Sequence, residues 1–151
     1  MREPGPVPPA DARLGLEFSV AATPNELAEF ERANFAANED QALLACAPLS
    51  VHGARTLEDA GVHYLMGRLD GEIVTSSVAY ARDGMVGVYG IATAPRHRRR
   101  GYGTALVREI TALRPDLHVS TWPAPESVRI YTPFGFMVCG DVAEWRSRPA
   151  R

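Results

Sequence analysis

The chain has 151 residues, 46% of them hydrophobic, and a formal net charge of −2. This length fits one domain with its own core. The near-neutral charge argues against nucleic-acid binding through overall charge, so we expect no nucleic-acid partner.

Cysteine and histidine usage points to a cytoplasmic protein without a metal site. The two cysteines, Cys46 and Cys139, form no CxxC motif, and the four histidines are scattered without metal-ligand spacing. No apolar run approaches the roughly 18 residues of a membrane span, so no membrane partner is expected. Residues 1–12 are proline-rich and predict a flexible tail ahead of a single domain over residues 13–151.

Turn signals and apolar periodicity divide the domain into elements. The dipeptides Asp70-Gly71 and Asp83-Gly84 are strong hairpin signals, and Thr23 or Asn25 is expected to cap a helix. The expected elements, in chain order, are a strand at residues 14–20, helices at 26–38 and 41–46, strands at 63–68, 72–81 and 85–93, a helix from about residue 101 to Pro115, a strand at 117–122, a short helix at 126–132, and strands at 135–138 and 142–146. A strand, a helix and another strand over residues 85–122 favour one parallel pair in an otherwise antiparallel sheet.

The segment RHRRRGYG joins the strand at 85–93 to the following helix. Gly101 and Gly103 allow a ligand to approach the backbone, and the first turn of a helix presents unpaired N–H groups and partial positive charge. Arg98, Arg99 and Arg100 add guanidinium donors. Together these features predict a site for an anion such as a pyrophosphate.

Other phosphate-binding patterns fit this segment less well. A P-loop needs GxxxxGK[ST], and no lysine is present here. A dinucleotide fold needs GxGxxG, and GYGTAL lacks the third glycine. The arginine run alone could be a nucleic-acid or localisation patch, but the strand before it and the glycines after it favour the anion site.

The segment GVYGIATAPRHRRRGYGTALV resembles motif A of the GCN5-related N-acetyltransferase (GNAT) family, with its R-x-x-G-x-G pattern opening a helix. Downstream, ESVRIYTPFGF resembles the family's motif B. The resemblance covers most of the domain and implies an α+β fold in α/β/α layers. Such a fold has a mixed, mostly antiparallel sheet of about seven strands, about four helices, and a splay between the parallel strands at 85–93 and 117–122.

This resemblance implies where acetyl-CoA would bind. The main chain of Ile91, Ala92 and Thr93 would pair with the pantetheine arm, and a strand amide would polarise the thioester carbonyl. The loop would surround the pyrophosphate through Arg98, Arg99, Arg100, Gly101, Tyr102, Gly103 and Thr104.

The resemblance also implies an N-acetyltransferase that acts by direct attack in a ternary complex. The acceptor would be a primary amine of a small molecule, peptide or protein. Tyr131 matches the motif-B tyrosine and is the expected general acid. The strand at 85–93 lacks Asp and Glu, so the general base is unassigned; Tyr89, His118 and Ser120 are polar groups near it.

The missing carboxylate leaves a second class of function open, a catalytically weak module that binds or senses acyl-CoA. The identity of the acceptor and of the acyl group is also open. Trp122 could line an acceptor pocket, and Glu39 and Asp40 could meet a cationic substrate. Late strands of such folds often pair between subunits, which makes a homodimer one option.

Overall fold

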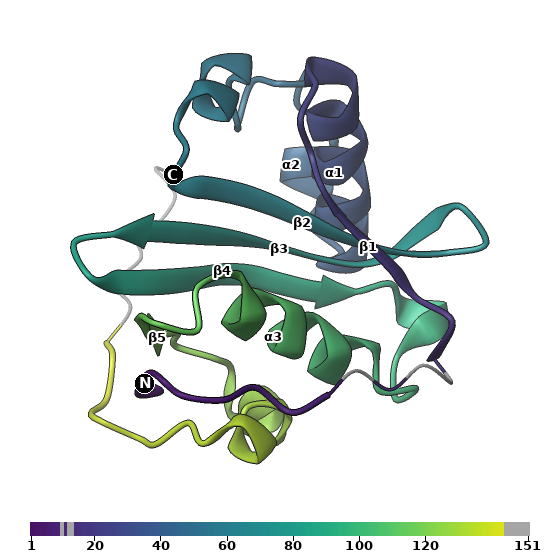
Figure 1. Cartoon of the computed structure of the whole chain (residues 1–151). Coiled ribbons are helices and arrows are strands. Elements are labelled where there is room, and N and C mark those ends of the chain that lie inside the picture. Colours follow the sequence, from purple (N-terminus) through teal and green to yellow (C-terminus); the bar gives the residue numbers. More distant parts are fainter. Residues whose placement is uncertain (10, 12–13, 144–151) are drawn as a thin grey trace.

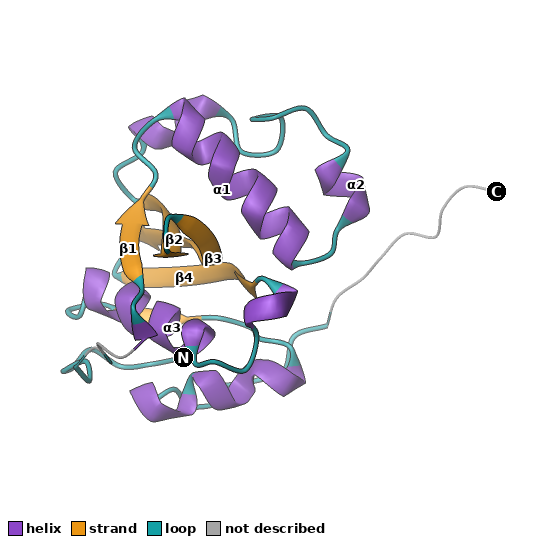
Figure 2. Cartoon of the chain, turned by 90° about the vertical axis from the view of Figure 1, so that its right-hand side faces the viewer, coloured by secondary structure: helices purple, strands orange, loops and turns teal. Residues whose placement is uncertain are grey.

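The computed structural model describes residues 1–9, 11 and 14–143. A five-stranded sheet lies between helix α1 on one face and helix α3 on the other (Figures 1 and 2). The strands follow the chain order: β1 (Glu17–Val20), β2 (Val62–Leu69), β3 (Glu72–Arg82), β4 (Met85–Thr93) and β5 (His118–Ser120). Neighbouring strands are antiparallel except β4 and β5, which are parallel. The predicted mixed α+β fold and its parallel pair are confirmed.

Helices α1 (Pro24–Ala37), α2 (Gln41–Leu44) and α3 (Tyr102–Leu113) are accompanied by short 3₁₀ segments. These are η2 (Ala54–Glu58), η3 (Pro95–His97), η4 (Pro125–Ile130) and η5 (Thr132–Phe134). The start of α1 is set by local chemistry. The Thr23 hydroxyl accepts from the Glu26 amide and the Glu26 carboxylate accepts from the Thr23 amide, which together form a capping box.

The two Asp-Gly turns join β2 to β3 and β3 to β4. Both residues of each turn have positive φ, 50° and 82° at Asp70 and Gly71, and 51° and 79° at Asp83 and Gly84. This is the backbone that two-residue hairpins require, since it matches the twist of the strands. The predicted antiparallel meander is present as a result.

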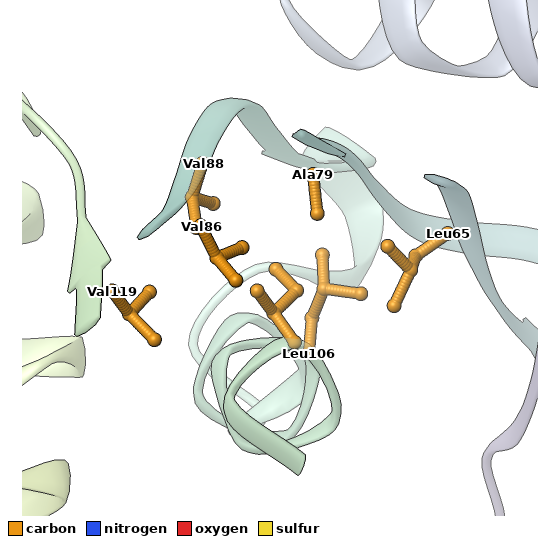
Figure 3. Packing of buried hydrophobic residues seen from close by; sticks show 7 residues of the cluster. Leu65, Ala79, Val86, Val88, Leu106 and Val119 are labelled. Atoms are coloured by element: carbon orange, nitrogen blue, oxygen red, sulfur yellow. The ribbon is translucent and has the colours of Figure 1, made fainter. Parts of the chain in front are cut away.

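Each face of the sheet has its own core because side chains alternate along the strands. Leu65, Ala79 and Val86 face α3 and pack with its buried Leu106 (Figure 3). On the other face Tyr64 and Met66 pack with Leu27 and Phe30 of α1. Full burial of such side chains stabilises the fold by about 1.5–3 kcal/mol each, so α1 and α3 are held against β2, β3 and β4.

The chain after β5 differs from the sequence prediction. The helix expected at 126–132 is replaced by η4 and η5, because Pro133 has no N–H to donate to the carbonyl four residues earlier. Residues 135–138, expected as a strand, form none. The last predicted strand, 142–146, runs beyond the described residues, whose sheet has five strands rather than seven.

The N-terminal segment, for which the sequence predicted a flexible tail, contacts the sheet through Arg2. Arg2 forms an isolated bridge with Val119 through two main-chain hydrogen bonds of 2.7 and 2.9 Å. Its guanidinium is buried and donates to the carbonyl oxygens of Phe134, Gly5 and Pro6. The free edge of β5 offers unpaired backbone groups, so these first residues are extended and attached at Arg2.

Candidate active site

The parallel strands β4 and β5 separate soon after they meet. Their last paired residues are Gly87 and Ser120. The Thr121 hydroxyl then donates to the Val88 carbonyl across 3.2 Å, one residue beyond this pair. Beyond this point β4 continues to Thr93 without β5 beside it.

A cavity of about 940 Å³ opens where the strands diverge. Four segments and the end of α1 line it. The lining comprises residues 88–93 of β4, residues 98, 99 and 101–104, residues 121–124, residues 126, 127 and 129–131, and Ala37 and Asn38. Its volume lies in the range of small-molecule and cofactor sites.

Backbone donors without protein partners gather at the start of α3. The first amide of the helix to bond is that of Ala105, which donates to Gly101. Within the described residues, the amides of residues 99–104 donate no hydrogen bond to the protein. Gly101 holds φ at 87° and Arg99 at 63°, left-handed values that turn the chain sharply into the helix. This is the local geometry of an anion site.

The three arginines of this loop have different surroundings. The Arg98 guanidinium donates to the carbonyls of Thr93 and Ala37 at 3.1 and 2.9 Å and pairs with Glu39 at 3.1 Å. Arg99 lines the cavity, and within the described residues it forms no ion pair. Arg100 is exposed and does not line the cavity. Arg98 therefore connects the end of α1 to the end of β4, which the sequence prediction of a phosphate ligand missed.

The backbone of β4 presents alternate residues to the two sides of the strand. The Ala94 amide donates to Val74 at 2.9 Å, on the β3 side. Since successive residues direct their main-chain groups to opposite sides, Thr93 and Ile91 face the open side, and Ala92 faces β3. The Ala92 carbonyl accepts from the Thr75 hydroxyl at 2.9 Å, which agrees with this assignment. Of the three β4 residues predicted to pair with a ligand, Ile91 and Thr93 are oriented toward the cavity.

Tyr131 lies at the junction of η4 and η5, on the cavity wall. Its ring is buried against Val107, Phe134 and Phe136. Burial raises the pKa of the Tyr131 hydroxyl, and a hydrogen bond with the Thr121 side chain opposes this increase. The tyrosine is therefore a neutral phenol near pH 7, placed beside the point where β4 and β5 diverge.

Comparison with known proteins shows the relationship directly. The sequence model of the acetyltransferase (GNAT) family matches residues 16–136. The chain belongs to this family. A search of the curated proteins found no match.

Solved structures of acetyltransferases share the fold. An aminoglycoside acetyltransferase from an uncultured soil metagenomic sample is 25% identical with a TM-score of 0.67, over 89% of this chain and 99% of that one. A GCN5-related N-acetyltransferase from Kribbella flavida is 27% identical with a TM-score of 0.61, over 88% of this chain and 50% of that one. A predicted acetyltransferase from Clostridium acetobutylicum, solved with acetyl-CoA, has a TM-score of 0.64 at 11% identity, over 88% of this chain and 95% of that one.

In this member of the GNAT family, the far wall of the cavity is aromatic. Tyr89 on β4 and Trp122 after β5 meet edge to face with ring centroids 5.2 Å apart. They are 41% and 60% exposed, although most rings of this size are largely covered in folded proteins. The sequence suggested Trp122 as an acceptor wall and gave no reason to pair it with Tyr89, because a contact between β4 and the segment after β5 is a tertiary feature.

Of the three polar groups named near the unassigned general base, Tyr89 lines the cavity. His118 and Ser120 are absent from the cavity lining, and His118 lies 3.3 Å from Glu3 instead. Glu126 is the one carboxylate among the described lining residues, and it is exposed. The sequence analysis singled out neither Glu126 nor Arg129, because the direction of a side chain on η4 depends on how that segment packs.

The described residues contain no cluster of three or more His, Cys, Asp or Glu side chains that could hold a metal ion. None of the helices they form is long and apolar enough to cross a membrane.

Proposed function

We propose that this protein transfers an acetyl group from acetyl-CoA to a primary amine by direct attack in a ternary complex. The observation that carries the proposal is the row of unpaired amides at residues 99–104, which opens into the same cavity as the diverging ends of β4 and β5. A diphosphate would complete the hydrogen bonding of these amides, and the start of α3 would favour its charge. Arg99, which lines the cavity without a protein ion pair among the described residues, supplies a guanidinium to it.

The acetyl-bearing arm of the substrate would then lie along the open side of β4. Ile91 and Thr93 are the residues whose main-chain groups face that side, although Arg98 already donates to the Thr93 carbonyl. Ile91 is therefore the residue best placed to pair with an extended amide-containing chain, as a strand would. An amide of this strand would also polarise the thioester carbonyl.

The reaction forms a bond between the amine nitrogen and the carbonyl carbon and breaks the carbon–sulfur bond. The amine loses one proton and the leaving sulfur gains one. Tyr131 is the proton donor to sulfur in this proposal, because its neutral phenol lies on the cavity wall. A phenol of pKa about 10 and a thiol of about 8.5 differ by about 2 kcal/mol, which is a small part of an acyl-transfer barrier.

The aromatic wall of the cavity bears on the class of acceptor. Of the charged side chains that line the cavity, Arg98 is paired with Glu39 and Arg99 would bind the diphosphate, which leaves Arg129 and Glu126 with opposite charges. Some related structures are aminoglycoside acetyltransferases, whose name denotes an amine-bearing acceptor. We favour an acceptor amine with an apolar or ring-shaped part that contacts Tyr89 and Trp122.

A second candidate is a module that binds acyl-CoA without efficient turnover. It is favoured by one observation: β4 carries no carboxylate, and the only acidic residue among the described lining residues is the exposed Glu126. A base that accepts the amine proton is then missing, and the amine must arrive neutral.

Calorimetry with acetyl-CoA tests the shared binding site. Gly103→Leu places a side chain where a Cβ already lies 3.6 Å from Ile130 and from Thr93, in the cavity wall. It should abolish binding, while Gly53→Leu, in open space, should leave it unchanged. Equal affinity of wild type and Gly103→Leu would refute the anion site.

A release assay for CoA with a panel of amines then separates the two candidates. Turnover with any primary amine supports the transferase. Binding of acetyl-CoA without turnover on arylalkyl, aminosugar and peptide amines supports the binding module.

A further inference from the structure

Strand β4 contains a bulge at the cavity. Ser76 of β3 is opposite Ala92, and Val78 is opposite Tyr89. One residue of β3 therefore faces two of β4, Gly90 and Ile91. Gly90 has a φ of 58°, a left-handed value that a residue with a side chain adopts only with strain. The bulge turns the peptide groups of this part of β4 out of the regular ladder.

Buried side chains from α1 and β3 hold the carbonyl groups of the bulge. The Asn34 side-chain amide donates to the Gly90 carbonyl at 2.8 Å and to the Ser76 hydroxyl at 3.0 Å. The Ser77 hydroxyl donates to the Tyr89 carbonyl at 2.9 Å. Asn34, Ser76 and Ser77 are 7%, 1% and 0% exposed. The bond between Asn34 and Ser76 is buried, and the bonds to the Gly90 and Tyr89 carbonyls are partly buried.

The hydrogen-bond partners of the Asn34 side chain determine which end of its amide is the nitrogen and which is the oxygen. A backbone carbonyl only accepts, so the nitrogen of the side chain must face Gly90. Both protons of that nitrogen are used, one on Gly90 and one on Ser76. The remaining oxygen accepts from the Asn38 side chain at 3.1 Å. A carboxylate at position 34 would have the same shape and no proton to donate.

The Gly90 carbonyl and the Ile91 amide belong to one planar peptide group and point in opposite directions. A contact that holds the Gly90 oxygen toward α1 therefore directs the Ile91 N–H away from α1. Both Gly90 and Ile91 line the cavity, so this N–H belongs to the cavity wall.

We propose that Asn34 is a positioning residue that, with Ser77, locks the bulge of β4 so that the Ile91 amide is aimed at the thioester carbonyl of the bound substrate. This inference rests on the proposed acetyl transfer and adds to it the group that orients the polarising amide. Asn34 does not touch the substrate. Helix α1 thereby contributes to the reaction through its packing against the sheet.

The matched test compares Asn34→Asp with Asn25→Asp, the same change in an exposed residue at the other end of α1. We expect Asn34→Asp to lower kcat at least about tenfold, since a lost oxyanion donor costs about a hundredfold or more. The dissociation constant for acetyl-CoA should change less than about threefold, because the amides of residues 99–104 are untouched. Asn25→Asp should match wild type in both quantities.

Two further readouts separate positioning from a general loss of structure. Infrared spectra of bound acetyl-CoA with a ¹³C-labelled thioester carbonyl should show a lowered stretching frequency in wild type, and a frequency nearer that of free acetyl-CoA in Asn34→Asp. The activity of Asn34→Asp relative to wild type should also rise as the pH falls, because a protonated carboxyl can again donate to Gly90.

Ser77→Ala removes the hydrogen bond to the Tyr89 carbonyl and replaces Asn34→Asp as the test variant if Asn34→Asp does not fold. Ser77→Ala should reduce kcat and shift the carbonyl frequency in the same direction as Asn34→Asp, but to a smaller extent. If wild type neither binds nor turns over acetyl-CoA, the proposed function fails and this inference with it. A different outcome would refute only the positioning role and leave the proposed function intact. In that outcome wild type is active, and Ser77→Ala, together with Asn34→Asp if it folds, has the kcat and the carbonyl frequency of wild type.

Discussion

The hydroxyl of Thr121 donates to the carbonyl of Val88 across 3.2 Å, one residue beyond the last ladder pair of β4 and β5. The same side chain lowers the pKa of the Tyr131 phenol, against the effect of burial. Because a hydroxyl has one proton and two lone pairs, Thr121 can accept from Tyr131 while it donates to Val88. It can also rotate and donate to Tyr131 when the phenol gives up its proton.

Replacing Thr121 with valine should therefore lower kcat several-fold, at about 1 kcal/mol for one hydrogen bond. Thr121→Ser keeps the hydroxyl and should stay close to wild type. A matched control is Thr56→Val, since Thr56 pairs with the Tyr64 hydroxyl at 2.8 Å and neither residue lines the cavity. Steady-state kinetics at saturating substrates would measure the effect. If Thr121→Val is as fast as Thr121→Ser, the Thr121 hydroxyl does not assist proton transfer from Tyr131.

The pH behaviour of Tyr131 gives a second prediction. Burial raises the pKa of this phenol above its ordinary value, and the Thr121 hydrogen bond offsets part of the increase. The proton donor should stay protonated up to about pH 10, so kcat should show no alkaline limb from Tyr131 below that pH. Tyr131→Phe should lower kcat roughly a hundredfold, the lower end for a lost general acid, and leave acetyl-CoA affinity unchanged.

The same pKa shift affects stability. Above the ordinary tyrosine pKa of about 10, the unfolded chain releases this proton while the folded protein retains it. The contribution of this group to the free energy of unfolding is therefore fully present below about pH 10. It is lost as the pH rises toward the raised pKa of Tyr131 in the folded protein. Denaturant unfolding on both sides of about pH 10 should show a steeper loss for wild type than for Tyr131→Phe, and equal slopes would contradict the raised pKa.

Features encoded by neighbouring residues could be predicted from the sequence. The Thr23 cap of α1, one of the two caps predicted, both Asp-Gly turns and the glycines at the start of α3 are local, and each lies where it was expected. The parallel β4–β5 pair followed from the strand–helix–strand order.

Features that depend on contacts between residues distant in the sequence could not be predicted in this way. The partners of Arg98 come from the end of α1, and Asn34 reaches Gly90 across 56 positions of the chain. Arg2 pairs with Val119 of β5, across more than a hundred positions of the chain. A polar residue on a helix gives no sign in the sequence that it will be buried against a bulge, because that depends on how the helix crosses the sheet.

The different surroundings of Arg98 and Arg99 predict different effects of the same substitution. Arg98→Ala removes bonds to Ala37 and Thr93 and should lower the free energy of unfolding by about 1–2 kcal/mol, with the half-exposed position limiting the loss. Arg99→Ala should leave stability unchanged and weaken acetyl-CoA binding, with a reduced dependence of affinity on salt. Thermal unfolding and calorimetry on both variants measure the two effects, and the prediction fails if Arg99→Ala destabilises as much as Arg98→Ala.

The aromatic pair on the cavity wall predicts how acceptor affinity will respond to mutation. Trp122 and Tyr89 expose their rings to the cavity, where an acceptor with a ring or an alkyl part can stack on them. Such contacts contribute about 0.5–1.5 kcal/mol beyond buried area, so Trp122→Ala should raise the acceptor KM by roughly three- to tenfold. Trp122→Phe should recover part of that loss. Acetyl-CoA affinity should be unaffected, and Val51→Ala, at an exposed apolar residue outside the cavity lining, should change neither constant. Should Trp122→Ala instead weaken acetyl-CoA and leave the acceptor KM as it is, the aromatic wall would belong to the acetyl-CoA half of the cavity.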